Sequence, residues 1–242
     1  MPYTNLNPFA ANLVNDFAKR MSKSGWKLGF KPLGDDDLLA AHLRKPSKGG
    51  SNTFNQVNIG LLCLHATKGQ NGDFTISGDG PLQTYMPIYK TGASNYDWVR
   101  ISECDFGAPY QGSTNLHWMA IAACDLLDDT IYQDMWDKGA LPINDNLHLL
   151  LGSRTIVYID PNLGELWAKY MLGGWFGIGA KTVEEAWFAA GAKTQHWAGP
   201  STNVTFRVAG WRNCFSDKLR VYENPDTSPG IDFDDRQVNP PQ

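Results

Sequence analysis

The stretches VNIGLLCLH (residues 57–65) and WMAIAAC (residues 118–124) decide the fold of this chain. Each is a short apolar run that ends at a side chain able to take part in chemistry. Continuous apolar runs of this length are typical of strands buried on both faces, as in a parallel sheet. We therefore expect two parallel strands that carry His65 and Cys124 at their carboxyl ends.

Helical patterns alternate with further apolar runs along the rest of the chain. The tetrad Thr182-Val183-Glu184-Glu185, for example, is a capping box that predicts the start of a helix. We expect helices over residues 8–22, 35–44, 125–136, 162–172 and 183–192, and further strands over 147–151, 204–211 and 219–222. This alternation favours an α/β domain with a mostly parallel central sheet in a three-layer sandwich.

Length and composition fit one soluble domain. The chain has 242 residues, of which 42% are hydrophobic, and a net charge of −4. This charge argues against nucleic acid and anionic lipid as partners, and no apolar run is long enough for a membrane span. We expect a single domain over residues 1–223 and an extended or disordered tail over residues 224–242.

The four cysteines show no metal-ligand spacing, since none of them forms a CxxC pair. We therefore expect no metal and no other cofactor. The N-terminus lacks the basic and apolar regions of a secretory signal, and four cysteines are few for a disulfide scaffold. Both observations favour a cytoplasmic protein, although a mature secreted chain would look the same.

His65 and Cys124 form a candidate catalytic dyad. Sites in parallel sheets form beyond the carboxyl ends of the strands. A histidine there could accept the thiol proton of Cys124, and the backbone N–H groups of Ala66 and Cys124 could hold an oxyanion. The alternative is structural, because free cysteines are often buried and acidic residues such as Asp125 oppose thiolate formation.

A resemblance to a known family rests on several pieces in order. They are VNIGLLCLH, WVRISECDFG, LHWMAIAACDLL, LHLLLGS, NLGELWAKYML and TVEEAWFAA. With this set the chain resembles the prokaryotic family called domain of unknown function 6345. That family is itself similar to the caspase–gingipain–legumain clan of cysteine peptidases, which has a histidine-glycine and an alanine-cysteine strand end. The resemblance implies a caspase-like fold with His65 and Cys124 as its dyad, although Ala66 replaces the glycine.

Two functions remain open from the sequence. The first is a caspase-like cysteine endopeptidase acting on a peptide or protein, with Trp98, Glu103 and Arg154 as candidate substrate-binding residues. The second is an inactive binding or self-assembly module, with a protein partner or a second copy of the chain. Aromatic residues favoured at interfaces would then make the contact: Tyr85, Tyr89, Tyr96 and Trp98. We expect His117 and His148, which precede their strands, to be structural.

Overall fold

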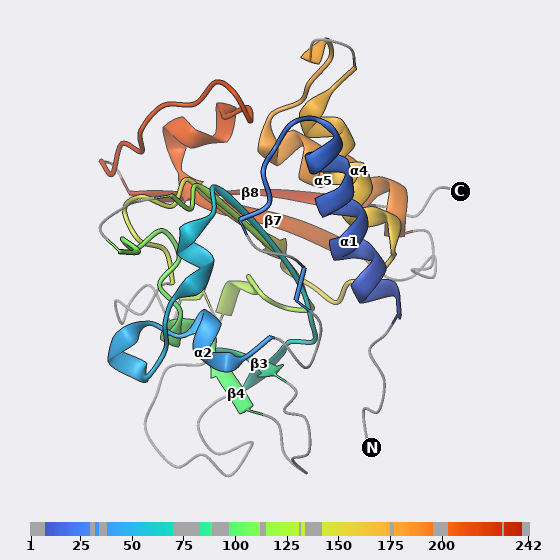
Figure 1. Ribbon diagram of the computed structural model, residues 1–242. Coiled ribbons are helices and arrows are strands. Elements are labelled where there is room, and N and C mark those ends of the chain that lie inside the picture. The colour runs from blue at the N-terminus through green and yellow to red at the C-terminus, as the bar shows by residue number, and fades with distance from the viewer. Residues whose placement is uncertain are drawn as a thin grey trace.

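The computed structural model has a central sheet of five strands in the order β1-β5-β6-β7-β8 (Figure 1). The strands are β1 (Ile59–Cys63), β5 (Trp118–Ala122), β6 (Leu149–Ser153), β7 (Val204–Trp211) and β8 (Ile231–Val238). The structure describes residues 8–29, 32–33, 38–69, 83–88, 97–111, 115–130, 132–133, 142–174, 177–195, 203–228 and 230–238.

The sheet is mixed. Strands β1, β5 and β6 are parallel to one another, whereas β7 pairs with β6, and β8 with β7, in the antiparallel sense. The α/β class is confirmed, but the antiparallel half differs from the mostly parallel sheet that we expected. Both antiparallel strands lie near the C-terminal end of the chain. The sequence pattern predicted a strand at residues 204–211 but did not predict its direction.

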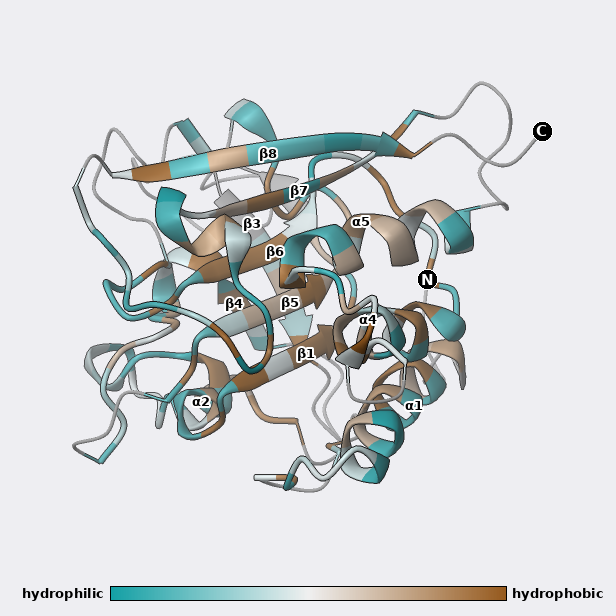
Figure 2. Ribbon diagram, turned by 90° about the horizontal axis from the view of Figure 1, so that it is seen from above, coloured by the Kyte–Doolittle hydropathy of each residue, from teal (hydrophilic) through white to brown (hydrophobic). Residues whose placement is uncertain are grey.

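Three helices cover one face of the sheet. They are α1 (Pro8–Lys23), α4 (Asn162–Leu172) and α5 (Val183–Thr194), which lie together on one side in both views (Figures 1 and 2). Their apolar residues share one core cluster with alternate residues of the parallel strands, such as Trp118, Ala120 and Leu149. The expected capping box is confirmed, because Thr182 Oγ1 accepts the Glu185 N–H at 3.1 Å.

The other face of the sheet packs on a second core cluster. Met119, Ile121 and Leu150 contribute to it from the central strands. The covering elements include the short helix α2 (Ala40–Leu43) and a small antiparallel sheet of β2 (Thr67–Gly69), β3 (Gln83–Ile88) and β4 (Asp97–Arg100). Short 3₁₀ helices are η1 (Pro46–Lys48), η2 (Thr53–Gln56), η3 (Ile101–Glu103) and η6 (Arg212–Ser216).

Several expected elements differ from the structure. Residues 124–127 form a turn, and within the expected 125–136 helix the described helical residues are 129–130 and 132–133. Residues 231–238, inside the expected tail, form β8, most of which has the hydrophilic colour in Figure 2. In place of the expected strand at residues 219–222, residues 219–220 form a turn that is closed by an isolated bridge between Lys218 and Val221. Tyr89 and Tyr96 lie outside the described residues.

No helix among the described residues is both long enough and apolar enough to cross a membrane. All four cysteines are free thiols in the structure. Cys104 and Cys214 are buried, whereas Cys63 and Cys124 are partly buried. No disulfide therefore contributes to the stability of the described part of the chain.

Glu184 is a buried acid at the contact between α5 and β8. The residue is 8% exposed, and among the described residues its Oε1 has no hydrogen-bond partner. Burial, followed by the contact with the Asp234 carboxyl, raises the pKa of Glu184 to about 8. Arg236 acts in the opposite direction, and Glu185 adds a further small rise. Glu184 is therefore protonated in the folded protein at neutral pH.

The Glu184→Gln variant should lose less stability than the wild type as the pH rises. Between its ordinary pKa and about 8, this acid releases its proton only on unfolding, so the stability of the wild type falls as the pH rises through this window. Urea unfolding should show the variant gaining at least about 1 kcal/mol over the wild type between pH 5 and pH 9. If the free energies of unfolding of the two proteins changed equally with pH, the pKa of Glu184 would not be raised in the folded protein.

Candidate functional site

His65 and Cys124 lie beyond the carboxyl ends of adjacent parallel strands. Cys63 on β1 lies opposite Ala122 on β5 in the strand register. The pairing extends one step further, because the Leu64 N–H donates to the Ala122 carbonyl at 3.3 Å. The segment after each strand then continues to its dyad residue, so His65 and Cys124 leave the sheet at the same edge and from neighbouring strands.

The two dyad residues differ in exposure. His65 is exposed and Cys124 is partly buried, so the Cys124 sulfur is not sealed in the core. The thiol donates to the Val157 carbonyl, with 3.6 Å between sulfur and oxygen. Burial raises the pKa of Cys124, and the adjacent Asp125 carboxylate raises it further. In this arrangement the resting sulfur is a neutral thiol.

A tight turn holds Cys124 in place. Asp125 has a φ of 50°, which is uncommon for a residue with a side chain. Its N–H donates to the Thr155 carbonyl at 3.2 Å, and the buried Ser153 hydroxyl donates to the Ala123 carbonyl at 2.5 Å. Because these bonds attach the turn to the segment after β6, they restrain the position of Cys124. The turn occupies residues 124–127, so Cys124 precedes the described helical residues 129–130 rather than standing at their start.

Arg154 follows β6 at the same edge of the sheet, and its charge is already paired. Its guanidinium forms ion pairs with Asp129 and Asp235. Arg207 pairs with the same two carboxylates, at 2.6 and 2.5 Å. This network joins the end of β6 to β7 and β8. The sequence suggested Arg154 as a substrate-binding residue, and in this structure its guanidinium is paired within the protein.

Trp98 and Glu103 gather around a different residue, Arg44. The Arg44 guanidinium donates to Glu103 Oε2 at 2.9 Å, to the Trp98 carbonyl at 2.8 Å and to Asp97. The Glu103 carboxylate is therefore paired as well. These residues lie in or beside β4 and η3, which contribute Val99 and Ile101 to the second core cluster.

Cys124 packs against the first core cluster, on the other face of the sheet from those residues. Ala66, the second expected oxyanion donor, leads directly from His65 into β2. Tyr85, which the binding-module hypothesis offered as an interface residue, is fully buried in β3. The structure thus brings the two dyad strands together and places Arg154 at the same edge of the sheet, whereas Glu103 and the Trp98 carbonyl bind Arg44.

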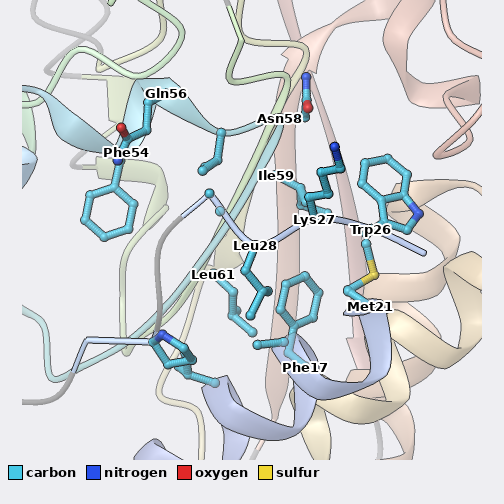
Figure 3. A pocket seen from close by; sticks show the side chains of 16 residues that line it. Phe17, Met21, Trp26, Lys27, Leu28, Phe54, Gln56, Asn58, Ile59 and Leu61 are labelled. Atoms are coloured by element: carbon cyan, nitrogen blue, oxygen red, sulfur yellow. The ribbon is translucent and has the colours of Figure 1, made fainter. Parts of the chain in front are cut away.

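One cavity lies along β1. It has a volume of about 180 Å³ and is formed by residues of α1, by residues 26–29 and 32, and by residues between 54 and 61. Figure 3 shows Phe17, Met21 and Leu61 on its apolar side, while Lys27 and Asn58 supply polar groups. Neither His65 nor Cys124 lines this cavity.

A second polar cluster lies at the opposite, N-terminal ends of β5 and β6. His148 Nδ1 is 2.6 Å from Asp217 Oδ2, and His148 Nε2 is 3.1 Å from His117 Nδ1. The Trp118 indole N–H donates to the same Asp217 oxygen at 2.9 Å. Burial, together with the neighbouring His148, lowers the pKa of His117 to about 4. His117 is therefore neutral at pH 7.

This cluster also contains a possible metal-binding set that the sequence did not reveal. The ligand atoms of His148, Cys214 and Asp217 all lie within 4.8 Å of one another, and all three residues are buried. His117 and His148 each precede a strand, and β5 and β6 are adjacent. The rule that placed His65 beside Cys124 would therefore also have paired these two histidines, but it gave no indication of Cys214 and Asp217.

The fold and this geometry define an α/β domain with a histidine and a cysteine at adjacent parallel strand ends. A family model described as domain of unknown function (DUF6345) matches residues 3–229. Because this match covers most of the chain, the protein belongs to that family. No curated protein and no solved structure shows a significant match to the chain.

Proposed function

We propose that the protein is a caspase-like cysteine peptidase that uses a His65–Cys124 dyad. The observation that carries the proposal is the register of β1 and β5, in which Cys63 lies opposite Ala122 and the dyad residues follow two positions later. The exposure of His65 and the partial exposure of Cys124 also favour it, because both reactive groups are within reach of a substrate. A caspase-like three-layer arrangement is part of the same proposal.

The proposed reaction is acyl transfer followed by hydrolysis. Cys124 Sγ attacks the peptide carbonyl carbon while His65 accepts the thiol proton, and His65 then gives this proton to the leaving amine. The backbone N–H groups of Ala66 and Cys124 would stabilise the oxyanion. A water molecule, deprotonated by His65, then attacks the thioester carbonyl. The C–S bond breaks, the acid leaves, and His65 returns the proton to Cys124 Sγ. Since burial and Asp125 raise the pKa of the resting thiol, activation depends on His65 approaching the sulfur.

A binding or self-assembly module on the same fold is the alternative. The observation in its favour is that two charged residues expected to bind a substrate, Arg154 and Glu103, are already paired within the protein. The raised pKa of Cys124 points in the same direction. In this alternative the Cys124 thiol is a structural residue of the turn.

Cysteine labelling and peptide digestion together distinguish the two functions. For the peptidase, iodoacetamide at pH 7 should modify Cys124 faster than Cys63, whose pKa burial raises to about 12. A peptide library should be cleaved by the wild type, with rates lowered at least about 100-fold in both Cys124→Ala and His65→Ala. Mass spectrometry measures both readouts.

The matched control is Cys63→Ala, which removes the neighbouring thiol on β1 and should leave cleavage unchanged. His65→Ala should also slow the alkylation of Cys124, because the base that assists thiolate formation is gone. If Cys124 and Cys63 react equally and the library stays intact, the peptidase proposal fails and the binding module is favoured.

A further inference from the structure

We propose that His148, Cys214 and Asp217 bind one divalent metal ion of the zinc type at the N-terminal end of the sheet. His148 Nδ1, Cys214 Sγ and a carboxylate oxygen of Asp217 supply the ligands, which lie within 4.8 Å of one another. The exposed fractions of the three residues are 1%, 0% and 2%. The site lies at the opposite end of β5 from Cys124, so it is independent of the proposed peptidase dyad.

The local backbone holds the two ligands that come from one segment. Cys214 lies in η6 and Asp217 ends it, and the Asp217 N–H donates to the Cys214 carbonyl at 3.0 Å. The Asp217 carbonyl accepts the Val183 N–H at 2.8 Å, which fixes the segment to the start of α5. His148 is held by its own N–H, which donates to the His117 carbonyl at 2.8 Å. The three ligands therefore come from elements whose positions are already restrained.

The donor set selects the class of metal. A thiolate, an imidazole and a carboxylate are the groups that bind Zn²⁺, whereas Ca²⁺ and Mg²⁺ prefer oxygen ligands alone. The charges also balance, because a thiolate and a carboxylate together neutralise a divalent cation. A neutral cluster can be buried at much lower cost than an isolated charge. Three protein ligands leave the fourth tetrahedral position for a water molecule.

The distance between His148 Nδ1 and Asp217 Oδ2 is that of a hydrogen bond, which metal binding would replace. Ligand atoms of a tetrahedral zinc ion are separated by about 3.3–3.6 Å. The contact of 2.6 Å between His148 Nδ1 and Asp217 Oδ2 is shorter, because a hydrogen bond occupies it. A metal ion would displace this proton and the thiol proton of Cys214, both of which leave to solvent, and would bind the other oxygen of Asp217. Oδ2 would stay with the Trp118 indole N–H.

The outer contacts match those of bound zinc sites. Histidine ligands usually place their second ring nitrogen in a hydrogen bond, and His148 Nε2 has His117 Nδ1 at 3.1 Å. Ligand carboxylates are usually hydrogen-bonded as well, as Asp217 is to Trp118 at 2.9 Å. The Tyr222 ring lies 5.4 Å from that of His148 and contributes to the cover of the cluster. An ordinary buried aspartate–histidine pair needs no cysteine beside it, and Cys214 is the feature that favours the metal.

Metal content and cobalt spectroscopy of the full chain test the proposal. Protein refolded with Zn²⁺ and dialysed should retain one zinc per chain, and EDTA treatment during unfolding and refolding should lower the melting temperature. Refolding with Co²⁺ should produce the near-ultraviolet charge-transfer band of a thiolate–cobalt bond. Both readouts use the wild type, so they do not depend on whether a variant folds.

Cysteine variants then locate the site. Cys214→Ser should abolish the cobalt band and weaken zinc binding at least about 100-fold. Cys104→Ser is the matched control, because Cys104 is equally buried at 1% exposure but lies in the other core cluster, and it should retain both signals. Asp217→Asn, which keeps an acceptor for Trp118, should also weaken binding. A wild type that retains less than about one tenth of an equivalent of zinc and shows no cobalt band overturns the proposal, and so does a band that survives Cys214→Ser.

Discussion

Replacing Trp187 with alanine is expected to lower the free energy of unfolding by about 3–5 kcal/mol. Trp187 is 1% exposed, and its ring lies 5.5 Å from that of Trp167 and 5.3 Å from that of Phe206. Its indole N–H donates to the Gly152 carbonyl at 3.0 Å, which ties α5 to the end of β6. The substitution therefore opens a cavity between the helices and the sheet and also removes the donor from a buried carbonyl. Urea unfolding measures the loss.

Two phenylalanine variants separate the packing of this ring from its hydrogen bond. Trp211 is also buried, but among the described residues its indole N–H has no partner. Trp187→Phe should therefore cost about 1–3 kcal/mol more than Trp211→Phe, because only the former leaves a buried acceptor without its donor. Equal losses in the two variants would mean that the bond to Gly152 contributes nothing to stability.

Gly107→Ala is expected to destabilise the protein by about 3 kcal/mol or more. Gly107 has a φ of +85°, and an added Cβ would lie 2.4 Å from the backbone nitrogen of Leu147. The variant thus combines an unfavourable backbone conformation with a collision against a second backbone segment. Neither segment can move freely, because the Gly107 N–H is bonded to Asn55 and the Leu147 N–H to Asn144.

Gly49→Ala is the matched control for this prediction. Gly49 has a similar φ of +75°, but nothing lies within 4 Å of an added Cβ. Its replacement should cost only the backbone term, about 1–2 kcal/mol. The difference between the two variants in urea unfolding measures the close approach at Leu147. If Gly107→Ala proves no more harmful than Gly49→Ala, the loop must relax more easily than its contacts suggest.

Local patterns were sufficient to predict several elements and one edge of the sheet. The helix that begins after the Thr182 capping box, the helix over 162–172 and the strand over 204–211 all form as the sequence indicated. Each depends on interactions within a few residues, such as the bond between Thr182 and Glu185. The adjacency of the His65 and Cys124 strands also followed from the sequence, because buried apolar runs separated by a long connection favour parallel pairing.

The tertiary structure alone decided the rest. The direction of β7 depends on which edge of the sheet is available for pairing, and so does the pairing of residues 231–238 as β8. The sequence pattern of one strand does not contain this information. In the same way, the sequence could not show that Arg154 pairs with Asp129 and Asp235. These ion pairs form because the fold brings β6 and β8 close to the residues that follow Cys124. The cluster at the other end joins Asp217 to His148 and Trp118 across 69 and 99 residues, respectively. Sequence by itself thus determined several helices and strands and the candidate dyad. Long-range packing determined which charges are paired and where a metal ion could bind, because those contacts join segments that no local pattern connects.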